Sequence, residues 1–142
     1  MRIIGRSQTP SVDGLVRLLR RIAPVGRAAL APSGDGAIVD ALLQAAMGVV
    51  AVGSGASLGE GVLVVHGVPG ALPLRDRSVE AVLVLVEDTA ALDEARRVAS
   101  AHVIALRLGS AAPPGLERVA AAPAGGFLER PRRHWVLYAR TA

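Results

Sequence analysis

Residues 80–86 read EAVLVLV, a run in which six apolar residues follow a single glutamate. A strand that is apolar at every position is buried on both faces, which is typical of a parallel sheet with helices packed on either side. The run is also far shorter than the ~18 or more apolar residues that a membrane-spanning helix needs. Residues 80–86 therefore predict a central strand of a mostly parallel α/β sheet.

Further strands and helices are predicted to alternate around this run. Four more apolar runs predict strands, at residues 27–31, 49–52, 62–65 and 102–108. Three segments with apolar residues at helical spacing predict helices, over residues 11–23, 37–47 and 88–99. Ser11 and Asp88 are suited to cap the first and third of these helices. The alternation favours a three-layer α/β sandwich.

The last thirty residues differ from this pattern. Residues 116–121 follow a Pro-rich loop and are expected to form one or two helical turns. Residues 127–130 and 135–139 are close enough in sequence to form a C-terminal antiparallel hairpin around residues 131–134. Because 142 residues lie within the usual size of one globular domain, we expect a single domain over residues 1–142.

The composition excludes several kinds of site. Without cysteine, the chain cannot form disulfides, thiolate zinc sites or iron–sulfur clusters. The three histidines are not at metal-ligand spacing, so no metal is expected. The net charge is +4 and every basic residue is arginine, but one Trp, one Tyr and one Phe are too few to stack the bases of a single-stranded nucleic acid. A nucleic-acid partner is therefore not expected.

The terminus and the hydropathy suggest where the chain works. The amino terminus lacks the apolar segment of a secretory signal, and no run is long enough to span a membrane. We expect a cytoplasmic protein without a membrane partner. The mean hydropathy of +0.44 fits an aliphatic, extensively buried chain and is compatible with a homo-oligomer such as a homodimer.

The segment that leads into residues 80–86 carries a resemblance to a known family. Residues 72–82, LPLRDRSVEAV, resemble the entry to the fourth strand of Rossmann-like (class I) methyltransferases that depend on S-adenosylmethionine (SAM), and the methyltransferase type 11 group in particular. Residues 92–98, LDEARRV, are similar to the helix that follows that strand in the family. Residues 102–108 are similar to its fifth strand, and residues 125–127 with 138–140 to its last two strands. The resemblance implies a methyltransferase sheet, with SAM as the cofactor.

In the amino-terminal half the order of elements agrees with the family, but the cofactor-binding residues depart from it. The family has an acid and a glycine-rich turn after its first strand, and here residues 30–36, LAPSGDG, keep only the glycines. The family's acids for the ribose and the adenine amino group are replaced by residues 52–54, VGS, and 66–71, HGVPGA. The resemblance places the following residues beside the cofactor: Ser33, Gly34, Asp35, Gly36, Gly53, Ser54, Ala71 and Leu72.

The connection between the second and third strands is short. Residues 53–61 number nine, whereas a crossover between parallel strands takes about a dozen or more residues and usually contains a helix. We expect this helix to be reduced or absent. The family's adenosine pocket would then be open on that side, or another subunit would close it.

These observations favour a degenerate SAM-dependent methyltransferase-like domain, a pseudoenzyme that is noncatalytic or depends on a partner protein. One alternative is an active SAM-dependent methyltransferase for a small-molecule acceptor, because the backbone N–H groups of a glycine turn can hold a ligand without a side-chain acid. The sequence is also compatible with an oligomeric interaction module and with an RNA-associated protein.

No residue is assigned a catalytic role from the sequence. His66, His102 and Glu87 are near predicted strand ends, where a lone titratable group is more often simply solvated. Residues 55–59, GASLG, match the nucleophile elbow of serine hydrolases, but no predicted helix follows to complete that motif.

Overall fold

The computed structural model describes residues 10–32, 36–53, 61–109, 111–125 and 132–141. These residues form three helices and seven strands: α1 (Asp13–Ile22), β1 (Val25–Ala31), α2 (Gly36–Ala45), β2 (Ala46–Val52), β3 (Val62–Val65), β4 (Val79–Val84), α3 (Thr89–Val98), β5 (Ala99–Arg107), β6 (Leu116–Pro123) and β7 (His134–Arg140). None of the helices in the described part of the chain is long and apolar enough to cross a membrane.

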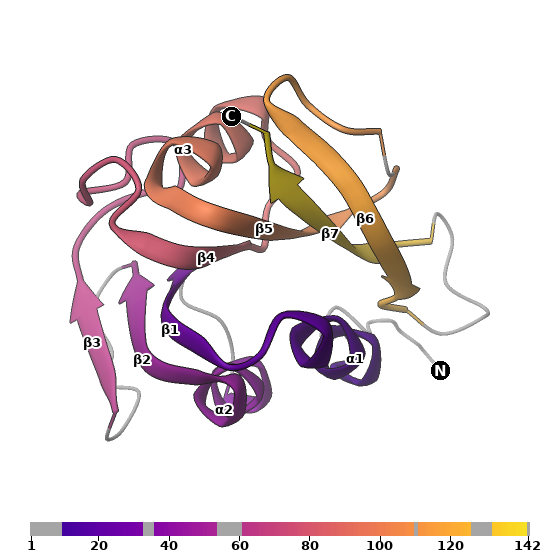
Figure 1. Ribbon diagram of the computed structural model, residues 1–142, viewed down its shortest axis with the longest axis horizontal. Helices are drawn as coiled ribbons and strands as arrows, with labels where there is room; N and C mark the ends of the chain where they lie inside the picture. The colour runs from indigo at the N-terminus through magenta and orange to yellow at the C-terminus, as the bar shows by residue number, and fades with distance from the viewer. Residues whose placement is uncertain (1–9, 33–35, 54–60, 110, 126–131, 142) are drawn as a thin grey trace, which may run out of the picture.

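The strands form one sheet in the order β3-β2-β1-β4-β5-β7-β6 (Figure 1). Strands β1 to β5 are parallel, with Ala29 opposite Val50 on one side and Val82 on the other. Strand β7 runs antiparallel to both β5 and β6. The expected fold, a mostly parallel Rossmann-like sheet ending in an antiparallel hairpin, is confirmed.

Helices cover both faces of the sheet (Figure 1). Helices α1 and α2 pack on one face, where the larger buried side chains include Leu15, Leu19, Leu42, Leu30, Leu83 and Trp135. Helix α3 packs on the other face, with Ala91, Leu92, Ala95 and Val98 against Val82, Val84 and Val103. Alternate residues of each central strand therefore enter different clusters, which is why residues 80–86 have almost no polar position.

The prediction for residues 116–121 was wrong. These residues lie in β6, which pairs with β7 from Leu116 opposite Arg140 to Pro123 opposite His134. Three consecutive alanines favour a helix by intrinsic propensity, but pairing with a buried neighbouring strand outweighs that preference. The strand predicted at 135–139 is confirmed as β7, whereas its predicted partner at 127–130 lies outside the described residues.

The two predicted helix caps had different outcomes. Asp88 caps α3 as expected, because its Oδ1 accepts a hydrogen bond of 3.0 Å from the Ala90 N–H. The N-cap of α1 is Val12 rather than Ser11, although Ser11 Oγ accepts a 3.4 Å hydrogen bond from the Asp13 N–H in the first turn. The backbone of Ser11 is also used: its carbonyl oxygen accepts a 2.8 Å bond from Trp135 Nε1, and its N–H donates to the Ala124 carbonyl at 2.7 Å. These bonds join the start of α1 to the C-terminal hairpin.

Candidate functional site

The carboxyl ends of the parallel strands are where ligands bind in sheets of this kind. Strands β2 and β3 end side by side, with Val52 opposite Val65, and β1 and β4 do the same, with Ala31 opposite Val84. The N–H of Gly53 donates to the Val65 carbonyl at 3.0 Å just beyond the paired ends. The carboxyl ends of β1, β2, β3 and β4 therefore lie along one edge of the sheet, called the carboxyl edge below.

Two of the predicted cofactor-binding glycines lie at this edge. Gly36 begins α2, directly after the loop that leaves β1, and a Cβ added there would meet no atom within 4 Å. Gly53 directly follows β2 and is buried. Ser33, Gly34, Asp35 and Ser54 lie outside the described residues, as does the 55–59 motif. The glycine turn and the end of β2 thus stay the predicted cofactor positions.

Ala71 and Leu72 lie in the connection between β3 and β4. Ala71 is exposed and closes a turn by donating its N–H to the Val68 carbonyl at 3.1 Å. Leu72 is buried in the cluster beneath α3. Its N–H donates to Glu94 Oε1 at 2.8 Å, and its carbonyl accepts from Arg97 Nη2 at 3.0 Å. The side chain and backbone of Leu72 are therefore both held by α3.

A charged network that the sequence analysis did not identify fixes this connection to α3. Arg97 binds Glu94 through two hydrogen bonds, of 2.7 and 3.0 Å, and Asp76 through one of 2.7 Å. The hydrogen bond from Arg97 holds the pKa of Glu94 below its usual range, although burial acts in the opposite direction. The acid and base three residues apart on a helix were a local signal. The partners Leu72 and Asp76 are too distant in sequence to give one.

The acids that follow β4 already have structural roles. Glu87 accepts a hydrogen bond of 3.1 Å from Arg107 Nε and one of 3.0 Å from the Leu108 N–H. Asp88 caps α3, as described above. Arg107 also donates to the Tyr138 hydroxyl at 2.8 Å, so Glu87 belongs to a network that joins β4, β5 and β7. Both carboxylates therefore already accept hydrogen bonds from within the chain.

The histidines are not brought together. His66 is exposed directly after β3, at the carboxyl edge. His102 is opposite Ala81 in the amino-terminal half of β5, away from the carboxyl edge. Burial lowers the pKa of His102, against the opposing effect of Glu80. In the ranges that the structure describes, no three His, Asp or Glu side chains are grouped as metal ligands would be.

Comparison with known proteins finds similar structures but no similar curated sequence. No family model and no curated protein matches the sequence. Among solved structures, the N-methyltransferase NodS from Bradyrhizobium japonicum WM9 superposes with a TM-score of 0.71 at 10% identity, covering 90% of this chain and 93% of NodS. In its complex with S-adenosyl-L-homocysteine the TM-score is 0.67, at 9% identity, covering 90% of this chain and 86% of that one.

A third similar structure is a complex between the Haloferax volcanii Trm112 methyltransferase activator and a protein described as a methyltransferase. It has a TM-score of 0.67 at 10% identity, covering 92% of this chain and 90% of that one. The strand order, the antiparallel β7 and these superpositions all indicate the same fold. The chain has the Rossmann-like fold of the class I SAM-dependent methyltransferases.

Proposed function

We propose that this chain is a degenerate SAM-dependent methyltransferase-like domain that does not transfer methyl groups alone and acts as a noncatalytic domain or with a partner protein. The observation that carries the proposal is the lack of acids at the ends of β1, β2 and β3, among the residues that the structure describes. Residues 14–34, 41–59 and 61–75 contain no Asp or Glu, and these ranges include the ends of β1, β2 and β3.

The missing acids matter because SAM presents hydrogen-bond donors to a protein. The ribose hydroxyls and the adenine amino group are donors, and a carboxylate is a strong, charge-assisted acceptor for them. Each hydrogen bond to a charged group contributes about 1.5–3 kcal/mol. Losing two of them therefore weakens binding by about a hundredfold or more.

Among the described residues, the acids that follow β4 do not replace them. Glu87 is held by Arg107 and the Leu108 N–H, and Asp88 caps α3. At the end of β2, Gly53 has no side chain, and its N–H donates to Val65. The described residues thus fit the adenosine part of SAM poorly.

A partner protein could supply what the edge lacks. The structurally similar protein in the Trm112 complex is bound to an activator of methyltransferases, which supports looking for such a partner here. A homo-oligomer stays a prediction of the same kind. Sedimentation equilibrium of the purified chain checks it, since a dimer would have twice the monomer mass of 14.5 kDa.

The direct test is calorimetric titration of SAM and S-adenosylhomocysteine into the purified chain, after removal of any copurified ligand. We expect no saturable binding at ligand concentrations up to about 1 mM, because the loss of the charge-assisted bonds should raise the dissociation constant to about that value or above. Micromolar binding would refute the proposal. It would favour an active SAM-dependent methyltransferase for a small-molecule acceptor.

A variant separates a missing acceptor from a missing pocket. Gly53→Asp places a carboxylate at the end of β2, and Gly53→Asn is the matched control of nearly the same size without the charge. Binding that appears only in the Asp variant would show that the ribose acceptor is the main defect. No binding in either variant would place the defect in the wall of the adenosine pocket.

A further inference from the structure

A second concave site lies away from the carboxyl edge, on the sheet face that α3 covers only in part. It is a groove of about 660 Å³ between β1, β2 and β3 on one side and the connection 66–78 on the other. Its lining comes from the sheet residues Arg27, Gly48, Val50, Leu63 and Val65 and from Pro73, Leu74, Arg75, Ser78 and Val79. We call it the sheet groove.

The sheet groove exists because of how the chain returns from β3 to β4. A parallel crossover normally carries a helix that covers the sheet. Here the described residues 66–78 contain no helix. The Leu72 N–H donates to Glu94 and Arg97 donates to Asp76, and these bonds hold the connection on α3. The connection therefore leans away from β2 and β3, and Leu63 is left 62% exposed.

The walls of the sheet groove are aliphatic. The aliphatic lining includes Val50 and Val79, which are already buried, and Leu63, Val65 and Leu74, which are partly or largely exposed. The volume lies within the range of about 300–1,000 Å³ that small-molecule sites occupy. The aliphatic part of a small-molecule ligand would shield the exposed side chains of this lining from water.

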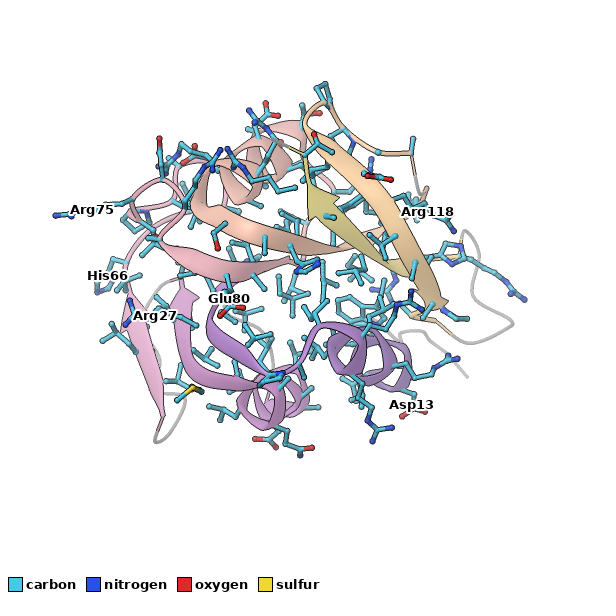
Figure 2. The ribbon with its side chains drawn as sticks, viewed as in Figure 1. Asp13, Arg27, His66, Arg75, Glu80 and Arg118 are labelled. Carbon is cyan, nitrogen blue, oxygen red and sulfur yellow. The ribbon has the colours of Figure 1, made fainter. Side chains whose placement is uncertain are left out.

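The polar groups of the sheet groove are cationic and unpartnered. Arg27 and Arg75 make no ion pair with any described residue, and no carboxylate among those residues lines the groove. Ser78 Oγ is buried and has no hydrogen-bond partner among the described residues, which is rare for a buried hydroxyl. Figure 2 shows Arg27 and Arg75 on the β3 side of the molecule, opposite Arg118 on β6.

A shallower hollow of about 490 Å³ continues the groove toward the amino ends of the strands. It shares Arg27 and Ser78 with the groove and adds Arg77 and Glu80. Glu80 is the one acid among the described residues there, and its Oε1 accepts a 2.8 Å hydrogen bond from the Gly26 N–H. The charge of the combined surface therefore remains positive.

We propose that the sheet groove binds an amphipathic organic anion, with an aliphatic chain lying against β2 and β3 and a carboxylate or phosphate head at Arg27 and Arg75. Guanidinium groups bind such heads through paired hydrogen bonds. The proposal does not depend on the state of the carboxyl edge, because it uses none of the predicted cofactor residues.

The test is titration of the purified chain with decanoate, decyl phosphate, decanol and inorganic phosphate, followed by calorimetry. The two amphipathic anions should bind at least about tenfold more tightly than decanol or inorganic phosphate. Only they can both pack an aliphatic chain on the apolar lining and pair an anionic head with Arg27 and Arg75. Equal binding of decanol, or of inorganic phosphate alone, would overturn the proposal. So would no binding of decanoate or decyl phosphate at about 1 mM, the weak end of the affinity scale.

Two variants locate the binding. A Cβ at Gly48 would meet nothing within 4 Å, so Gly48→Leu should enter the groove without a backbone clash and weaken both anions about tenfold. The double variant Arg27→Ala, Arg75→Ala should remove the preference for the anions over decanol. Arg118→Ala on β6 is the charge control and should bind as the wild type does.

Circular dichroism and thermal unfolding confirm that each variant is folded before its binding is compared. Unchanged anion binding in folded Gly48→Leu would refute the location. A dimer that buries the groove, seen as wild-type dimerisation in sedimentation that Gly48→Leu abolishes, would also refute the proposal, because a second copy would then be the occupant.

Discussion

The network around Arg97 gives the most specific prediction about stability. Arg97→Met keeps the aliphatic stem but removes the guanidinium group that binds Glu94, Asp76 and the Leu72 carbonyl. We expect the variant to fold with the connection 66–78 less firmly held on α3.

The expected loss follows from the exposure of each partner. The Asp76 side chain is 75% exposed, so its ion pair contributes little. Glu94 is only 22% exposed, and its two hydrogen bonds with Arg97, together with the bond to Leu72, are the stronger contacts. Because Arg97 is itself about one-third exposed, we reduce the usual value for charged hydrogen bonds to about 1–2 kcal/mol in total. For a chain of this size that lowers Tm by roughly 3–6 °C.

The assay is a double-mutant cycle of Glu94→Gln and Arg97→Met, measured by urea unfolding at pH 7. Residues in direct contact should show a coupling free energy of about 1 kcal/mol. Arg96→Met is the matched control, because the Arg96 guanidinium has no ion pair with a described residue. A coupling near zero, or an Arg97→Met variant as stable as Arg96→Met, would refute the reasoning.

The pH dependence of stability tests the role of Glu94 independently. The folded-state pKa of Glu94 is lowered from 4.5, so the unfolded chain binds more protons in this range. The contribution of Glu94 is therefore complete above about pH 4.5 and is lost as pH falls through the folded-state pKa. The stability difference between the wild type and Glu94→Gln should shrink between pH 6 and pH 3. A difference that is independent of pH would contradict the assignment.

Three further predictions test the packing. Gly14→Ala should destabilise the chain by about 1–3 kcal/mol in thermal unfolding despite the better helix propensity of alanine, because the new Cβ would lie 2.6 Å from the Pro123 carbonyl oxygen. Trp135→Phe should cost about 1–3 kcal/mol in urea unfolding, since the buried indole loses its bond to Ser11. Burial lowers the pKa of His102, so the wild type should lose stability relative to His102→Gln as pH falls through 6.5, and an NMR titration of the imidazole should give a pKa below 6.5.

Strand β4 and helix α3 could be predicted because the signals that define them are local. The apolar run 80–86 reports burial on both faces directly, and Asp88 caps α3 with an N–H only two residues away. Strand β6 could not be predicted in the same way. Its alternation is weak and its alanines favour a helix, so its conformation is decided by pairing with β7, which lies beyond a further loop.

The candidate site was predictable only in part for a related reason. The positions of Gly36 and Gly53 follow from the strand ends, which the hydrophobic runs locate. Leu72 was expected beside the cofactor, but its packing depends on Glu94 and Arg97, more than twenty residues later in the chain. No local pattern shows which way an irregular connection will lean, so the sheet groove could not be predicted either.

The connection between β3 and β4 bears on both the carboxyl edge and the sheet groove. In a sheet of this kind a cofactor is recognised by side chains that the loops bring to the carboxyl edge. The loop after β3 brings His66 and small residues but no acid, and from Leu72 onward the chain turns to α3. A helix in this connection would have covered β2 and β3. Its absence leaves Leu63 exposed and Arg27 without an ion-pair partner among the described residues. The same connection therefore contributes no acid to a SAM site and leaves the sheet groove open. Because the groove uses none of the predicted cofactor residues, ligand binding at the two sites can be tested separately on one folded protein.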